Sequence, residues 1–145
     1  METLDEQREK VKNLNRKKLT ELLDEGKTID EIVLFVKNED ALTTHYDLRE
    51  TWFNHFGYNL MKEGKKDDAL KIFKLNTELY PNEYNTFDSY GDCLLQLGDK
   101  KNAIKAYKKS LELNPQERNA LVTLKEIYTR LNMKEELEKI NAKLK

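Results

Sequence analysis

Apolar and small residues recur through the middle of the chain with the spacing of amphipathic helices. Phe53, Phe56, Gly57 and Leu60 lie at positions i, i+3, i+4 and i+7, which together form one face of a helix. The same face returns one period later, and segments 50–83 and 84–117 are identical at 12 of 34 positions without a gap. A gapless period of this length predicts two helix–turn–helix units that stack on each other.

Glycine and proline repeat at the places where such a unit has to turn. Gly64 and Gly98 follow the first helix of each unit. Gly26 has the matching position between two predicted helices upstream. Glycine suits the left-handed conformation that ends a helix, so these three are predicted turn positions. Pro81 and Pro115 are predicted to end the second helices, because proline has no backbone donor.

A glycine inside a helix needs a packing reason, because it costs about 1 kcal/mol relative to alanine. Gly57 is predicted to lie where the second helix of its unit crosses the first, so that no side chain separates the two backbones. Ala69 is expected to face it, and Phe73 to fill the space beyond. The second unit is expected to repeat this arrangement around Gly91.

Both ends of the chain carry weaker versions of the unit. Residues 118–145 continue the apolar stripe but have Lys125 at the glycine position, which predicts a degenerate, charged helix pair that caps the stack. Upstream, a leucine-rich stretch that includes Leu14 predicts a helix from about Thr3 to Glu25. Thr28 and Glu31 then form a capping-box pattern at the start of the next helix.

These elements predict an all-α fold, a right-handed α-solenoid of stacked antiparallel helix pairs with about eight helices. The expected units are residues 1–49 (a divergent N-terminal helix pair and connector), 50–83, 84–117 and 118–145. Trp52 is expected to pack on the helix that carries Ile32, Phe35 and Val36, and thereby to join the N-terminal unit to the repeats.

Composition and charge narrow the class of protein. The 145 residues include only 5 Gly and 2 Pro, too few for the turns of an all-β fold. With 26 basic and 27 acidic residues, the chain lacks the basic excess typical of nucleic-acid binding. The basic stretch that contains Lys10, Lys12 and Lys18 is interrupted or bordered by acidic residues, which favours a solvated helix face. We therefore expect no nucleic-acid partner.

Membrane and targeting signals are weak in the sequence. The longest apolar run, residues 32–36, is far shorter than the roughly 20 residues that span a bilayer, and the charged N-terminus lacks the apolar core of a signal peptide. We expect no membrane partner and a cytoplasmic protein, or a periplasmic one if the chain is cut from a secreted precursor.

Candidate catalytic groups are few. His45 and His55 are the only histidines and lack the spacing of metal ligands, and Ser89 has no glycine elbow. Cys93 lies within an apolar helical stripe, where a buried structural thiol is expected. The sequence predicts no enzyme, no metal and no cofactor; a small hydrolase assembled from distant residues is a third alternative.

The repeating pattern resembles the tetratricopeptide repeat, a helix–turn–helix unit with Gly, Ala, an aromatic residue and Pro at set places. More narrowly, Gly57-Tyr58-Asn59-Leu60, Phe73-Lys74-Leu75-Asn76, Leu79-Tyr80-Pro81 and Asp88-Ser89-Tyr90-Gly91-Asp92 look like a tetratricopeptide tail of bacterial serine hydrolases of the esterase and β-lactamase-like group. The catalytic motifs of that group, S-x-x-K and G-x-S-x-G, do not occur.

The resemblance implies a protein–protein interaction module that presents a concave groove, lined by the first helices, to a peptide or partner protein. The groove residues that it implies are Asn54, Tyr58, Met61, Asn85, Asp88, Asp92, Asn119, Val122 and Glu126. Some members hold a C-terminal carboxylate in a Lys/Asn/Arg clamp; those cations are missing at the matching places here, so that ligand is not expected. The alternative function is a structural or dimerising tail of a hydrolase with no ligand of its own, and a homodimer is left open.

Overall fold

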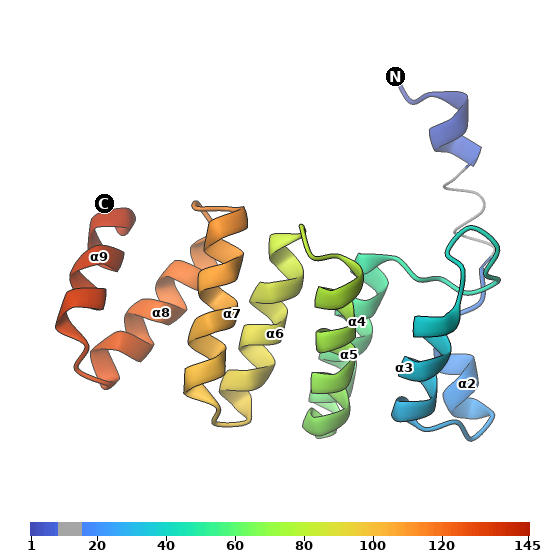
Figure 1. Cartoon of the computed structure of the whole chain (residues 1–145), viewed down its shortest axis with the longest axis horizontal. Coiled ribbons are helices and arrows are strands. Elements are labelled where there is room, and N and C mark those ends of the chain that lie inside the picture. Colours follow the sequence, from blue (N-terminus) through green and yellow to red (C-terminus); the bar gives the residue numbers. More distant parts are fainter. Residues whose placement is uncertain (9–15) are drawn as a thin grey trace.

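The computed structural model describes residues 1–8 and 16–145. Residues 4–8 are helical, and further helices follow from residue 20 to residue 144 (Figure 1). These are α2 (Thr20–Asp24), α3 (Ile29–Asn38), α4 (Glu50–Lys62), α5 (Lys66–Leu79), α6 (Tyr84–Gln96), α7 (Lys100–Leu113), α8 (Arg118–Arg130) and α9 (Lys134–Leu144). Within the described ranges, the strand-like pairing consists of an isolated bridge between Lys17 and Tyr46.

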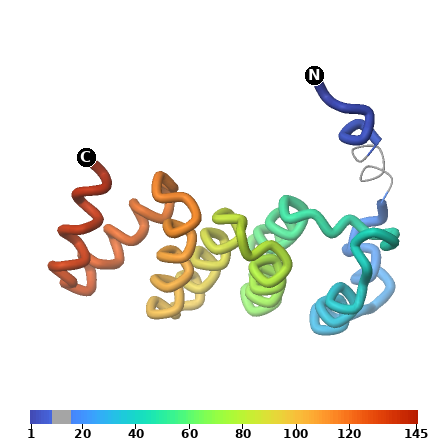
Figure 2. Tube along the Cα trace, turned by 45° about the horizontal axis from the view of Figure 1, so that its top comes forward, coloured from blue at the N-terminus to red at the C-terminus, as the bar shows by residue number. Residues whose placement is uncertain are grey.

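Helices α2 to α9 stack in a single row, as Figures 1 and 2 show. The pairs α4/α5, α6/α7 and α8/α9 pack within themselves, and α5 packs on α6 as α7 packs on α8. At the N-terminal end α3 packs on α5, and ion pairs join the two helices between Lys37 and Glu78 (3.4 Å) and between Lys71 and Asp30 (3.0 Å). The predicted all-α solenoid of helix pairs is confirmed.

The turns between paired helices follow the predicted glycines. Gly26, Gly64 and Gly98 have φ values of 91°, 79° and 82°, in the left-handed region that glycine enters without steric cost. The third unit has Asn132 at the matching place, with φ 55°; asparagine tolerates this conformation better than other side chains do. Helix α5 ends at Leu79 and α7 at Leu113, so each helix stops just before its proline.

The prediction for the two mid-helix glycines is wrong in one respect. A Cβ atom added at Gly57 would lie 2.5 Å from Cε1 and Cζ of Phe73, and one added at Gly91 would lie 2.9 Å from Cε1 of Tyr107. An aromatic ring therefore lies directly over each glycine and separates the two backbones. Each glycine has no side chain and so leaves room for the ring. The ring in turn fills space between the two helices that would otherwise be empty.

The prediction of one N-terminal helix from Thr3 to Glu25 is also wrong. Residues 16–19 are not helical, and α2 extends only from Thr20 to Asp24. Lys17 pairs instead with the connector, since its N–H donates to the carbonyl of His45 at 2.7 Å. Leu14, which carried part of this prediction, lies outside the described residues, as do Lys10 and Lys12 of the basic stretch.

The predicted capping box at the start of α3 is confirmed. Thr28 Oγ1 accepts from the N–H of Glu31 at 3.1 Å, and Glu31 Oε1 accepts from the N–H of Thr28 at 3.2 Å. Each side chain thereby satisfies a backbone donor that the first turn of a helix leaves free.

A buried ion pair fixes the connector between α3 and α4. The Asp47 side chain is fully buried and accepts from Arg49 Nε at 2.9 Å, Arg49 Nη2 at 2.8 Å and Lys18 Nζ at 3.1 Å. Burial by itself raises the pKa of Asp47, but the hydrogen bonds from Arg49 and Lys18 outweigh it and lower this pKa to about 2. The connector is thus held to the segment just before α2 by a charged contact.

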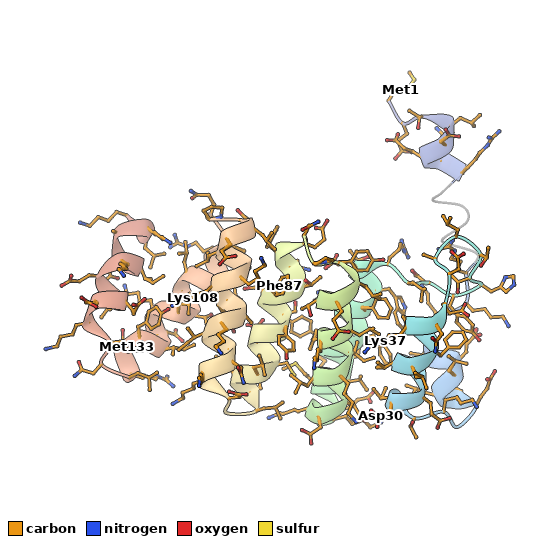
Figure 3. All side chains as sticks on the ribbon, in the orientation of Figure 1. Met1, Asp30, Lys37, Phe87, Lys108 and Met133 are labelled. Atoms are coloured by element: carbon orange, nitrogen blue, oxygen red, sulfur yellow. The ribbon has the colours of Figure 1, made fainter. Side chains whose placement is uncertain are left out.

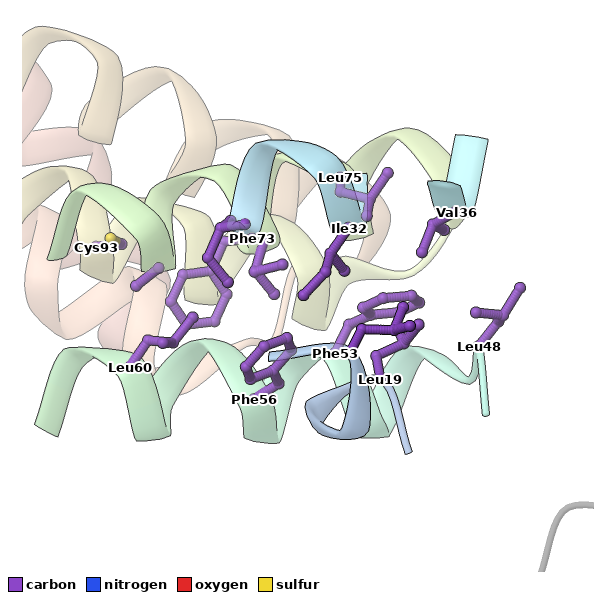
Figure 4. Packing of buried hydrophobic residues seen from close by; sticks show 14 residues of the cluster. Leu19, Ile32, Val36, Leu48, Phe53, Phe56, Leu60, Phe73, Leu75 and Cys93 are labelled. Atoms are coloured by element: carbon purple, nitrogen blue, oxygen red, sulfur yellow. The ribbon is translucent and has the colours of Figure 1, made fainter. Parts of the chain in front are cut away.

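The apolar core runs along the stack as two adjoining clusters, one from Leu19 to Cys93 and one from Leu94 to Ile140. Figure 4 shows the first cluster, in which Leu19, Ile32 and Phe53 come together from three different elements. Trp52 is half-buried against this cluster, with its ring centroid 4.9 Å from that of Phe56.

The two units differ in burial at two positions of the apolar face, one of them Phe56, which is buried while its counterpart Tyr90 is half-buried. Phe53 is fully buried, whereas Phe87, its counterpart in the next unit, is half-buried near the N-terminal end of α6 (Figure 3). Thr86 is buried there in its place, and its hydroxyl donates to the carbonyl of Glu83 at 2.9 Å.

Among the described residues, no helix is long and apolar enough to span a bilayer.

Candidate binding groove

The first helices of the three C-terminal pairs, α4, α6 and α8, are joined by a chain of side-chain hydrogen bonds. Tyr58 of α4 donates its hydroxyl proton to Asp92 Oδ2 of α6 at 2.6 Å. Asn119 of α8 donates from Nδ2 to Asp92 Oδ1 at 3.3 Å. Three predicted groove residues, each from a different helix pair, therefore lie together, and we call the surface that they share the first-helix face.

A second-helix residue joins the same network. Tyr107 of α7 donates from its hydroxyl to Asp92 Oδ1 at 2.5 Å, and its ring reaches this point by lying over Gly91. The repeat pattern had placed Tyr107 in the core alone. One signal for the second role is present in the sequence, since Phe73, its counterpart in the preceding unit, lacks the hydroxyl group.

Both tyrosines stay protonated in this setting. Burial, followed by the hydrogen bond to Asp92, raises the pKa of Tyr58 and the pKa of Tyr107 well above the usual range. The two hydroxyls are therefore fixed hydrogen-bond donors, and Asp92 is the common acceptor that joins α4, α6 and α7.

Asp88 lies one helical turn before Asp92 and is 8% exposed. Both of its oxygens accept from Asn119 Nδ2, at 3.1 and 2.9 Å. Burial, a hydrogen bond with Glu117 and the negative charge of Asp92 together raise the pKa of Asp88 to about 8, although the Asn119 bond acts in the opposite direction. Glu117 also caps α8, because Oε2 accepts from the N–H of Ala120 at 2.9 Å.

The remaining predicted groove residues are less tightly held. Asn85 donates to Glu50 Oε1 at 2.9 Å. The side-chain oxygen of Asn54 is buried and has no hydrogen-bond partner in the described part of the chain. Met61 is half-buried, while Val122 (38% exposed) and Glu126 face solvent.

Among the described residues, the cysteine and the two histidines lie in different environments. Cys93 is fully buried, and burial raises the pKa of its thiol to about 11, which keeps it protonated. His45 and His55 are exposed. Across residues 1–8 and 16–145, no group of three or more His, Cys, Asp or Glu side chains is placed to hold a metal ion.

Two of the hollows elsewhere on the described part of the stack have mostly apolar linings. One, of about 370 Å³, opens beside α3 and is lined by Leu22, Ile32, Leu34 and Phe35 among others. The other, of about 310 Å³, lies between α7, α8 and α9 over Leu124 and is bordered by lysine and glutamate side chains. Neither was predicted from the sequence.

The paired helices, the left-handed turn glycines and the repeat period agree with a comparison against known families. The family model described as tetratricopeptide repeat matches residues 85–117. This segment is similar to a tetratricopeptide repeat. The match covers the second predicted unit, including the turn at Gly98 and the proline at position 115.

The similarity to solved structures extends beyond residues 85–117. A mutant of MamA is similar over 79% of this chain and 58% of that chain, with a TM-score of 0.59 and 19% sequence identity. This similarity is one of fold, and it spans just over half the length of that chain. No curated protein matches the sequence. The predicted resemblance to serine-hydrolase tails stays a prediction.

Proposed function

We propose that the chain is a non-catalytic protein-interaction module that presents the first-helix face as a concave groove to a peptide or partner protein. The observation that carries this proposal is the hydrogen-bond chain from Tyr58 through Asp92 to Asn119, because it holds the side chains of three helix pairs in one arrangement. A face ordered before binding loses less conformational entropy when a partner is bound.

Apart from Asn85, which bonds to Glu50, the predicted groove residues divide into two groups by what they contact. Tyr58, Asp88, Asp92 and Asn119 bond to one another, and in this proposal they set the shape of the groove. Asn54, Met61, Val122 and Glu126 are the residues proposed to contact the partner. This second group contains a buried amide oxygen without a described partner, two apolar side chains and one carboxylate.

The side chains of the second group indicate what kind of partner segment would bind there. Val122 and Met61 offer apolar contact area. We therefore propose an extended or helical segment with an apolar side chain as the ligand.

A displayed random peptide library, selected against the full chain, supplies a probe whose affinity calorimetry can measure. Val122→Asp should weaken the selected peptides at least tenfold, since it places a charge in the contact. Leu79→Asp is the matched control, because Leu79 is also 38% exposed but lies on the second helix α5. Equal affinity for wild type and Val122→Asp, or equal losses in both variants, would contradict the groove assignment.

We propose further that the module acts in the cytoplasm on protein partners rather than on nucleic acid or membranes. Light scattering of the full chain over a range of concentrations distinguishes a monomer from the homodimer that the sequence leaves open. A mass that doubles with concentration would assign part of the surface to self-association.

A further inference from the structure

The N-terminal end of the stack carries an uncovered apolar hollow. Helices α2 and α3 form this end of the row (Figure 1), and the residues that line the hollow of about 370 Å³ beside α3 all lie between positions 22 and 39. None of the helices α4 to α9 therefore lines it. Leu34, one of the lining residues, is 63% exposed, more than any other large apolar side chain of α2 to α9. An exposed apolar surface beside a hollow is typical of an interaction site.

The opposite end of the row is covered by charge. The outermost helix there is α9, and its exposed side chains include Lys134, Glu135, Glu138 and Lys139. Arrays of stacked units need polar surfaces of this kind at their ends to stay in solution. The N-terminal end has no such cover around Leu34, and a partner that covers this leucine would supply it.

Two opposite charges lie at the two ends of the hollow. Lys27 precedes the N-terminus of α3, and Glu39 is the C-cap of the same helix, so the ten residues of α3, about 15 Å of helix, separate them. A helix favours negative charge at its N-terminus and positive charge at its C-terminus. Lys27 and Glu39 therefore each lie at the less favourable end of their own helix.

We propose that two copies of the chain associate through this hollow, with their α3 helices antiparallel across a two-fold axis. The rotation brings Glu39 of one copy to the N-terminal end of α3 in the other, where Lys27 lies. The same ion pair forms twice, as in any contact of a surface with its own copy. Each charge also comes close to the helix end that favours it, which a partner without this pattern would not provide.

The apolar part of the contact fits the same arrangement. Leu34 lies near the middle of α3, so the rotation that exchanges the two ends of the helix leaves the two leucines close to the axis. Each leucine then faces the hollow of the other copy, which is lined by Leu22, Ile32 and Phe35 among others. A cavity of about 150 Å³ holds a benzene molecule, so this hollow has room for a leucine side chain. This inference does not rest on the first-helix face.

Sedimentation equilibrium of the full chain, from micromolar to millimolar concentration, measures the association. The wild type should show a monomer–dimer equilibrium. Leu34→Asp should raise the dissociation constant at least tenfold, since it places a charge in the apolar contact. Leu131→Asp is the matched control, because Leu131 is an exposed leucine (43%) in the last helix pair, and this variant should associate as the wild type does. Circular dichroism checks that every variant is folded.

Charge reversal tests the antiparallel orientation. Lys27→Glu and Glu39→Lys should each weaken the dimer, because like charges then meet across the axis. The double variant, with Lys27→Glu and Glu39→Lys in one chain, should bind more tightly than either single variant, since both ion pairs return with their signs exchanged. A partner of a different kind would not produce this recovery.

Three results would overturn the proposal. The first is a wild-type chain that stays monomeric at millimolar concentration, which would assign the hollow to a partner other than a second copy. The second is a dimer that Leu34→Asp does not weaken or that Leu131→Asp weakens equally, which would place self-association on another surface. The third is a double charge variant that dimerises no more tightly than the single variants, which would exclude the antiparallel arrangement.

Discussion

Gly57→Ala tests whether the ring of Phe73 packs directly against Gly57, where the sequence predicts that no side chain lies between the two helices. The added methyl group would lie 2.5 Å from Cε1 and Cζ of Phe73 and 2.9 Å from Cδ1. Phe73 is fully buried, and its ring contacts that of Tyr58 at a centroid distance of 5.0 Å. The ring therefore has to shift within a packed interior, or α4 and α5 have to move apart.

Two opposing effects set the size of the change in the free energy of unfolding. Overpacking a core costs about 1–3 kcal/mol, and the gain in helix propensity from Gly to Ala returns about 1 kcal/mol. A contact of 2.5 Å belongs at the upper end of the first range, because three ring atoms are involved. We expect Gly57→Ala to lower the free energy of unfolding by about 1–2 kcal/mol.

Urea unfolding followed by circular dichroism measures this change. Asn59→Ala is the matched control, since Asn59 is exposed on the same helix and its replacement should show only the small gain in propensity. Phe73→Leu should lower stability alone but should add less than its own cost to Gly57→Ala, because the smaller side chain relieves the contact. A Gly57→Ala chain as stable as the wild type, or strictly additive costs in the double variant, would refute the packing argument.

Three further outcomes are expected. Asp92→Ala should lower the free energy of unfolding by about 2–4 kcal/mol, because it leaves the hydroxyls of Tyr58 and Tyr107 without their acceptor; a loss no larger than that of Tyr58→Phe would contradict its role as common acceptor. Asp47→Asn should be less stable than the wild type at pH 6, and the difference should vanish as the pH falls from about 4 to about 2, where Asp47 itself becomes protonated; acid titrations of both chains check this. Cys93 should react with a disulfide reagent at pH 8 only as fast as the chain unfolds, since its thiol is buried and its pKa is raised to about 11; rapid labelling of the native chain would contradict this.

The elements of the repeats could be read from the sequence because their causes are local. A left-handed turn residue, a proline just after a helix and an amphipathic face depend on a few neighbours along the chain. Gly64, Gly98 and Pro81 therefore predicted the turn and end positions that the structure has. Asn132 takes the same turn conformation and was missed, because asparagine is a weaker signal for it than glycine.

The N-terminal unit was harder to read for the same reason. A run of leucines favours a helix locally, but the backbone of Lys17 pairs with the connector near Tyr46, and Asp47 draws Lys18 toward it. These partners come from a separate segment of the chain, beyond α2 and α3. A local pattern cannot show whether residues 16–19 are lower in free energy as part of a helix or as a segment paired with the connector.

By itself, the sequence determined that the chain folds as stacked helix pairs and where the two repeat units turn. Only the tertiary structure decided which side chains meet between the helices. The ring of Tyr107 lies over Gly91 and its hydroxyl donates to Asp92, and Asp88 accepts from Asn119 across the joint with α8. A repeat period shows which positions are equivalent, but hydrogen bonds between helices depend on the distances between those helices, and packing sets these distances.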